Sequence, residues 1–407
     1  MAVSESAALN GLRVELLKRL KLKRFCQPTP LASRLLPCLI HQARIMPLKL
    51  CLSTANTLTY PQGGHLWVFI NWALGFKSCG CEVAWLDCVP TTLQETEIAA
   101  NYQNLREALG PFGLDDTLAV DFLSREDCTE RLLKTGIPTL EHYVPFDILV
   151  DLRYDLPERL LEYASRTALI NIDPGLYELA LNGGAFPEPK HDTLFSIGER
   201  HGQVNNKNFL HTRPCVFLDE WPFVSSPSDS PWTTVAHWWS PDYYEDSKRE
   251  SFRDFMTIPL QVEARFELAL NLEHEAEQKR IESYGFKVSE AHKMVHSPLD
   301  FRSFIQSSAG EFSCAKPSYV RNRTAWVSDR TVCYLASGKP CVVQNTGESH
   351  YLPSNRGMHR FCDLSGAVEA IRAVTANYDS ETRAARSLAE EFFDAHKVCS
   401  SLLSHAL

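Results

Sequence analysis

Short apolar segments alternate along most of the chain with longer segments whose apolar residues recur at helical spacing. From Met46 onward the apolar segments have the length of buried strands, and the segments between them are long enough for helices. In the first half, the predicted strands are residues 48–53, 81–87, 147–152, 168–172 and 193–197. Strands connected through helices in this way predict a parallel sheet with helices on both faces.

A segment rich in Pro and Ser, residues 221–231, interrupts this alternation. Repeated Pro excludes both a helix and a central strand, so we expect a linker there. The alternation then resumes, with strands predicted at 233–238, 267–271, 286–289, 312–315, 340–344 and 361–363. The fold class is therefore α/β, with Rossmann-like βαβ domains expected over residues 46–224 and 225–385 and a terminal helix over 386–407.

Residues 1–45 differ from the rest of the chain in charge. They contain eight Lys or Arg and two Glu, a net charge of +6, and leucines from Leu9 to Leu20 recur at helical spacing among the basic residues. A basic amphipathic helix is typical of a segment that makes peripheral contact with an anionic membrane or enters an organelle. Two other interpretations stay open: the helix packs on the outside of the fold, or the protein begins at Met46.

The overall composition excludes several classes of protein. Hydrophobic residues make up 44% and charged residues 22% of the 407 residues, which is typical of a globular chain with a core. No apolar run approaches the roughly 20 residues of a membrane span. The net charge of −9 argues against nucleic acid as a partner. The 13 Cys are scattered without zinc-finger spacing, which predicts reduced thiols and a cytoplasmic location.

The first candidate site follows the first predicted strand, where a loop ends in Gly63-Gly64-His65. Two glycines allow the backbone to approach a ligand closely, and the start of a helix offers free N–H groups. His65 would lie at the carboxyl end of a parallel sheet, where open α/β folds bind ligands, and could act as a general base. A tight turn followed by a helix cap explains the same residues, and the dinucleotide-binding spacing is absent.

The second candidate site is the start of a helix predicted over residues 329–337. Ser328 or Asp329 is a suitable N-cap, and Gly338 is a suitable stop. Such a helix start could bind a phosphate, with Arg330 adding a charge-assisted contact, although capping alone also explains Ser328 and Asp329. The polar turn over residues 344–348, after the next strand, could hydrogen-bond a hydroxyl-rich ligand.

Two further segments lead to the same sheet edges. A basic loop that contains Lys316 and Tyr319 precedes the candidate phosphate helix and could clamp a diphosphate. Asp173 follows a predicted strand within Asp-Pro-Gly, a sequence that is equally typical of a plain turn.

Taken together, these features resemble the GT-B glycosyltransferases. The resemblance rests on the two Rossmann-like halves, on Gly63-Gly64-His65, and on Leu-Ala-Ser-Gly-Lys-Pro at residues 335–340 before an apolar strand, and it covers roughly residues 46–400. Residues 311–316 and 326–338 are more narrowly similar to a bacterial group of glycosyltransferase-like proteins. The resemblance implies two domains that face a central cleft, with the last helices crossing back to the N-terminal domain.

The resemblance also implies roles for individual residues. His65 would be the catalytic base, with Asp151 or Asp173 as its partner. Cys333 stands where many GT-B enzymes carry a Glu that holds the donor ribose, so that contact must differ or be lost. The implied donor-binding residues are Gly63, Gly64, Lys316, Tyr319, Ser328, Asp329, Arg330, Thr331, Asn345, Thr346, Gly347 and Glu348.

The activity that this resemblance implies is transfer of a sugar from a nucleotide-sugar donor to the hydroxyl of an unidentified acceptor. No Asp-x-Asp motif stands in a loop suited to a metal–diphosphate complex, so we expect no metal and no cofactor besides the donor substrate. His65 favours inverting chemistry without deciding it. A nucleotide-sugar epimerase of the same fold, which needs no acceptor, and a non-catalytic sugar- or nucleotide-binding descendant are the alternatives.

Overall fold

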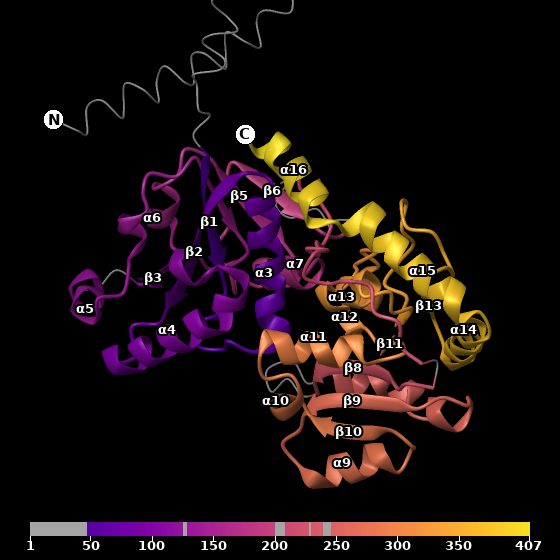
Figure 1. Cartoon of the computed structure of the whole chain (residues 1–407). Coiled ribbons are helices and arrows are strands. Elements are labelled where there is room, and N and C mark those ends of the chain that lie inside the picture. Colours follow the sequence, from indigo (N-terminus) through magenta and orange to yellow (C-terminus); the bar gives the residue numbers. More distant parts are fainter. Residues whose placement is uncertain (1–46, 125–127, 200–207, 228, 239–245) are drawn as a thin grey trace, which may run out of the picture. The chain divides into compact units, whose positions relative to one another are not determined.

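The computed structural model describes residues 47–124, 128–199, 208–227, 229–238 and 246–407 (Figure 1). Residues Leu48–Leu407 form one compact unit. The basic helix predicted within residues 1–45 lies outside the described residues. Within the described part of the chain, no helix is both long enough and apolar enough to cross a membrane.

The first sheet has seven parallel strands in the order β3-β2-β1-β4-β5-β6-β7. The first strand lies inside the sheet, and both its faces are buried, because Leu50 and Leu52 join one apolar cluster and Cys51 joins another. The strands are β1 (Leu48–Thr54), β2 (Cys81–Val89), β3 (Leu118–Phe122), β4 (Ile148–Asp151), β5 (Thr167–Asn171), β6 (Thr193–Ser196) and β7 (Leu210–His211). The helices are α3 (Gly63–Ser78), α4 (Glu95–Leu109), α5 (Cys128–Thr135), α6 (Glu158–Leu161) and α7 (Leu176–Asn182).

The second sheet has six parallel strands in the order β10-β9-β8-β11-β12-β13. Its strands are β8 (Trp232–His237), β9 (Phe266–Asn271), β10 (Lys287–Glu290), β11 (Gly310–Ser313), β12 (Cys341–Gln344) and β13 (Met358–Phe361). Its helices are α8 (Lys248–Phe252), α9 (Glu275–Glu282), α10 (Ala291–Met294), α11 (Pro298–Gln306), α12 (Pro317–Asn322), α13 (Asp329–Ala336) and α14 (Leu364–Ala376). Then follow α15 (Tyr378–Leu388), the π-helical turn η7 (Ala389–Phe393) and α16 (Ala395–Ala406).

Both strand orders are those of a Rossmann-like sheet, in which the first strand is internal and the order reverses beside it. The predicted fold class of two Rossmann-like domains is therefore confirmed. β3 and β7 were not predicted from the sequence. β3 has five residues and carries Asp121, whose carboxylate pairs with Arg159 at 2.8 Å, and β7 has two residues.

Helix α3 connects the first sheet to elements of the second. The N–H of Gly63 donates to the carbonyl oxygen of His296 at 3.1 Å. The indole Nε1 of Trp67 donates to the carbonyl oxygen of Pro298, the first residue of α11, at 2.7 Å. Helix α16, yellow in Figure 1, runs back from the second half and packs along the indigo α3.

Gly75 allows α16 to approach α3 closely. A Cβ added at this position would lie 2.6 Å from Sγ of Cys399 and 2.9 Å from Cβ of Ala395, both on α16. Since side-chain carbons do not approach one another this closely, any larger residue must push the two helices apart.

We expect Gly75→Val to lower the free energy of unfolding by about 1–3 kcal/mol, the usual cost of overpacking a core. The measurement is urea denaturation followed by circular dichroism. Gly110→Ala is the matched control, because a Cβ at Gly110 meets nothing within 4 Å and the residue has a φ of −51°. Equal stability of the two variants would contradict a packing role for Gly75.

Candidate functional site

The carboxyl ends of the two sheets face each other, and hydrogen bonds link them directly. The hydroxyl of Tyr60, in the loop after β1, lies 3.0 Å from Nε2 of His237 at the end of β8. The hydroxyl of Tyr319 in α12 donates to Oδ1 of Asp173, after β5, at 2.5 Å. Open α/β sheets bind ligands outside the carboxyl ends of their strands, so the region between the two sheets is the candidate site.

His65 lies in the first turn of α3, beside this region. Its Nε2 is 2.7 Å from the carbonyl oxygen of Ala55, and its ring packs edge-on against the rings of Tyr60 and Phe69. A carbonyl can only accept, so neutral His65 carries its proton on Nε2 and its lone pair on Nδ1. Burial lowers the pKa of His65, and the nearby His237 lowers it further, which keeps the ring neutral near pH 7.

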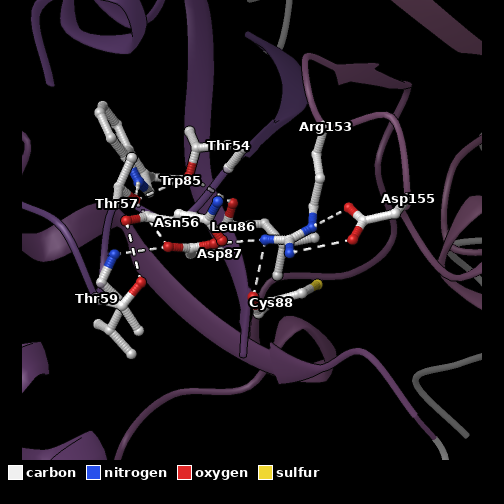
Figure 2. Close-up of polar contacts among 12 residues, drawn as sticks. Thr54, Asn56, Thr57, Thr59, Trp85, Leu86, Asp87, Cys88, Arg153 and Asp155 are labelled. Carbon is white, nitrogen blue, oxygen red and sulfur yellow. Dashed lines mark hydrogen bonds and ion pairs between the residues drawn. The ribbon is translucent and has the colours of Figure 1, made fainter. Parts of the chain in front are cut away.

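A buried ion pair holds the loop between β1 and α3 (Figure 2). Oδ2 of Asp87, in β2, accepts the N–H of Leu58 at 2.6 Å and the hydroxyl of Thr57 at 3.0 Å. Oδ1 of Asp87 pairs with Nη1 of Arg153 at 3.0 Å, and Arg153 also contacts Asp155 at 2.6 Å. Burial raises the pKa of Asp87 to about 6. The hydrogen bonds and the guanidinium of Arg153 favour the charged form and act in the opposite direction. The network fixes the loop that ends in His65.

Neither of the predicted carboxylate partners is bonded to His65. Oδ2 of Asp151 lies 3.2 Å from Nε2 of His191, and both side chains are buried. Asp173 accepts the hydroxyl of Tyr319 instead. Oδ1 of Asp151 accepts the N–H of Arg153 at 2.9 Å. Within the described residues, no hydrogen bond or ion pair joins His65 to Asp151 or Asp173.

Gly63 and Gly64, which the resemblance implies as donor-binding residues, are covered by the second half of the chain. A Cβ on Gly63 would lie 2.5 Å from the carbonyl oxygen of Val295, and one on Gly64 would lie 2.6 Å from the ring of Phe301. The two glycines are needed for close packing of α3 against α11. In this structure the second half of the chain therefore packs where a ligand was expected to approach the backbone of these glycines.

The predicted N-cap of the second candidate site is confirmed. Helix α13 begins at Asp329, and Oγ of Ser328 accepts the N–H of Arg330 at 3.3 Å. A cavity of about 30 Å³ lies at this helix start. Its lining includes Ser328, Arg330, Thr331, Gln344, Thr346 and Arg360, from the carboxyl-end region of the second sheet.

Arg330 differs from the expected phosphate contact. Its Nε donates to Oε1 of Glu311 at 2.8 Å, and its Nη1 donates to the carbonyl oxygen of Val235 at 2.7 Å. Its Nη2 donates to Oγ of Ser313 at 2.5 Å. The charge of Arg330 is therefore compensated by Glu311, which is fully buried. This guanidinium ties α13 to β11 and β8.

Arg360 lines the same cavity but, unlike Arg330, lacks a hydrogen-bond partner at one nitrogen within the described part of the chain. It was not selected from the sequence. Its Nη2 is buried and has no hydrogen-bond partner among the residues that the structure describes. Burial lowers the pKa of Arg360, against the favourable charges of Tyr351 and Glu199. Arg360 could have been selected from its place near the carboxyl end of β13, but the predicted strand began only at residue 361.

Lys248 is a second cation that the sequence analysis missed. It lies in the first turn of α8, and its Nζ donates to the carbonyl oxygen of Cys314, a residue that lines the cavity. Burial lowers the pKa of Lys248 to about 7, and the positive charges of Arg330 and Lys316 lower it further. Cationic groups thus crowd one end of the second sheet.

The other implied donor-binding residues lie in different surroundings. The ring of Tyr319 stacks on that of Trp326 with centroids 4.1 Å apart, and the hydroxyl of Thr346 donates to the carbonyl oxygen of Trp326 at 2.7 Å. Burial raises the pKa of Asp329 to about 7. Thr331 lines the cavity and is buried, whereas Lys316, Asn345, Gly347 and Glu348 stand outside its lining.

Cys333, at the position where the resemblance implies a ribose-binding Glu, is buried between α13 and α3. Its thiol lies 3.3 Å from the carbonyl oxygen of Asp329 and 3.8 Å from Nδ2 of Asn71. A ribose cannot reach this position while α3 covers it.

Solved structures with the same fold include three glycosyltransferases. An alpha-glucosyltransferase in complex with UDP-glucose and DNA is 12% identical, with a TM-score of 0.57 over 88% of this chain and 99% of that one. HepE from Anabaena, in complex with UDP-glucose, is 10% identical, with a TM-score of 0.52 over 88% of this chain and 100% of that one. A glycosyltransferase from Rickettsia africae ESF-5 is 11% identical, with a TM-score of 0.51 over 88% of this chain and 98% of that one.

No model of a known protein family matches the sequence, and no curated protein does either. The structural similarity extends over most of the chain and over nearly all of each similar structure. The resemblance to GT-B glycosyltransferases is thus confirmed for the fold, and the chain has the two-domain architecture of that class.

We expect Asp87→Asn to destabilise the protein by about 3–5 kcal/mol, because it leaves the buried Arg153 without its buried anionic partner. Urea denaturation measures the loss, and hydrogen exchange at the Leu58 amide reports whether the loop loosens. Asp155→Asn is the control: Asp155 contacts the same guanidinium but is 43% exposed, so its loss should cost less than about 1 kcal/mol. Similar losses in the two variants would argue against Asp87 as the anchor.

Proposed function

We propose that the protein is a glycosyltransferase that moves a sugar from a nucleotide-sugar donor to an acceptor hydroxyl. The observation that carries the proposal is Nη2 of Arg360, a buried atom that has no hydrogen-bond partner among the described residues and belongs to the cavity at the start of α13. A buried donor without a hydrogen bond is costly, and a phosphate oxygen would relieve that cost. The backbone N–H groups at the start of α13 favour an anion at the same place.

The surrounding charges support a diphosphate as that anion. Lys248 has a lowered pKa partly because Arg330 and Lys316 are nearby, and a bound diphosphate would restore its positive charge. Two of the glycosyltransferases of similar fold are described in complex with UDP-glucose. We therefore take a uridine diphosphate sugar as the first donor to test. Metal independence stays part of the proposal, since a cationic cluster can stabilise the leaving diphosphate.

Donor binding requires the two halves to separate. A cavity of about 30 Å³ holds a water molecule, whereas ligand sites of this kind measure about 300–1,000 Å³. The contacts that must yield are those across the sheet ends, Tyr60 with His237 and Tyr319 with Asp173. The described arrangement is then the closed one.

His65 is suited to act as the general base on the acceptor. Its Nε2 is engaged by Ala55, so Nδ1 is the atom that would take the proton of the acceptor hydroxyl. Its lowered pKa keeps that nitrogen unprotonated at neutral pH. The loop network of Asp87 fixes the ring's position without a carboxylate partner.

A non-catalytic nucleotide-binding protein is the second candidate, and two observations favour it. Cys333 is buried where a ribose-binding Glu would stand, and Arg330 is occupied by Glu311. Binding of UDP without any release of UDP from UDP-glucose, in the presence of diverse acceptor alcohols, would favour this candidate.

We expect Arg360→Met to weaken UDP binding by about tenfold or more, the usual effect of losing a charge-assisted contact. Isothermal titration measures the affinity. Because Nη2 of Arg360 has no hydrogen-bond partner in the described structure, its removal should lower the melting temperature less than the loss of a fully hydrogen-bonded guanidinium does.

Arg330→Met is the matched control for this experiment. It removes a guanidinium from the same cavity but leaves the fully buried Glu311 unpaired, so it should lower the melting temperature clearly. Unchanged UDP affinity in a folded Arg360→Met protein would refute the diphosphate site.

We expect His65→Gln to slow UDP release from UDP-glucose by about 10²–10⁴-fold, since Gln can still donate to Ala55 but cannot take a proton. Donor affinity should change little, because the donor cations lie in the other half. Steady-state kinetics over pH 5–9, with UDP affinity measured in parallel, separates the two effects. Near-wild-type turnover in the variant would rule out His65 as the base.

A further inference from the structure

A second cavity, of about 360 Å³, lies between the edge of the first sheet and helix α16. Its volume is within the range of small-molecule sites and about twelve times that of the cavity beside Arg360. On the sheet side it is lined by Phe195 of β6 and by Leu210 and His211 of β7, which pair with β6 in parallel. None of the residues used in the proposed transfer lines it.

One face of α16 forms the opposite wall. Lys397, Val398, Ser401, Leu402 and His405 all line the cavity, and their spacing places them on one side of a helix. Val398 and Leu402 are buried, while Lys397, Ser401 and His405 are exposed at the rim. The wall is therefore apolar at its base and polar or basic at its mouth.

The charges around this cavity have one sign. Arg213 and Lys397 line it together with two histidines, and no Asp or Glu is among its lining residues in the described part of the chain. The guanidinium of Arg213 lies 4.4 Å from the ring centre of Tyr351 and 5.5 Å from that of Phe392. Stacking of this kind leaves the edge of a guanidinium available for a planar or tetrahedral anion.

Apolar surface is also exposed at the mouth. Leu210 keeps 41% of its surface exposed, although it sits beside the buried Phe195. Lys397 donates to the carbonyl oxygen of Glu390 at 2.7 Å, which leaves two of its N–H groups for a ligand. Exposed apolar surface next to positive charge is the chemistry that recognises an amphiphilic anion. A phosphate or a similar group would contact Arg213 and Lys397, and a short alkyl chain would cover Leu210 and Leu402.

We propose that this cavity is a second ligand site, separate from the donor site, for a single-chain amphiphile with a phosphate-like head group. The site does not depend on the proposed transfer, since its lining comes from β6, β7, the two residues after β7, Phe392 of η7 and α16. Its volume suits about one short chain and excludes the two long chains of a bilayer lipid.

Octyl phosphate, used below its micellar concentration, is the probe. We expect it to raise the melting temperature of the full-length protein saturably, and to bind at least tenfold more tightly than inorganic phosphate or octanol, which each carry half of the chemistry. Saturating UDP should leave this binding unchanged. Absence of saturable binding, or displacement of the probe by UDP, would overturn the proposal.

Three variants locate the site. Ser401→Trp fills the cavity from an exposed rim position and should abolish binding with little change in stability. Arg213→Gln should weaken binding by about tenfold, and Arg213→Lys should restore part of it. Lys279→Gln, an exposed lysine on α9, is the control and should bind like the wild type. Wild-type affinity in both Ser401→Trp and Arg213→Gln would exclude this cavity as the binding site.

Vesicles of phosphatidylcholine with and without phosphatidic acid distinguish a free amphiphile from a lipid in a membrane. Because the cavity suits one short chain, we expect octyl phosphate to bind while neither kind of vesicle sediments the protein through this site. Sedimentation with phosphatidic acid that Ser401→Trp abolishes would overturn the single-chain assignment.

Discussion

The buried pair of Asp87 and Arg153 is the interaction on which the central region depends. It connects the end of β2 to the segment after β4, and through Leu58 and Thr57 it also holds the loop that leads into α3. Burying two charges is costly, and two further hydrogen bonds to the carboxylate and donations from the guanidinium to Cys88 and Asp155 offset part of that cost, since the pKa of Asp87 still stays raised. What the pair provides is a single geometry for the loop. That geometry directs the ring of His65 and sets where α3 begins to pack on the second half.

The fold was predictable where the pattern of the chain is local. Strands buried on both faces appear as continuous apolar runs, which made β1, β9 and β11 predictable within a few residues. β7 has two residues, too short for any run to show. β3 carries the charged Asp121, whose carboxylate pairs with Arg159, 38 residues further along the chain. β3 was therefore missed because the partner of its charged residue lies far away in the sequence.

The same distinction applies to the contacts at the candidate site, where partners close in sequence were predictable and distant partners were not. Ser328 caps a helix through an atom two residues away, and the sequence predicted it. Arg330 was expected to contact a phosphate, but its partner Glu311 lies on β11, 19 residues earlier in the chain. Gly63 and Gly64 were expected to contact a ligand, but they pack against α11, which lies more than 230 residues further on. Arg360 was missed for the converse reason, since an absence of partners is visible only when all the neighbours are in place.

Two guanidiniums line one small cavity, and they differ in their hydrogen-bond partners. Arg330 is neutralised by Glu311 in the protein alone, so its contribution to stability is complete without a ligand. Arg360 keeps a buried Nη2 with no partner in the described structure, so the closed arrangement retains an unfavourable electrostatic free energy. An anion that enters between the sheets removes this cost only when the sheets close around it. Ligand binding and closure are then coupled in one equilibrium. Contacts such as the hydrogen bond between Tyr319 and Asp173 stabilise the empty closed state, and the affinity for the anion is reduced by that stabilisation. A site arranged in this way favours a ligand with enough charge to replace those contacts, which is the property of a diphosphate.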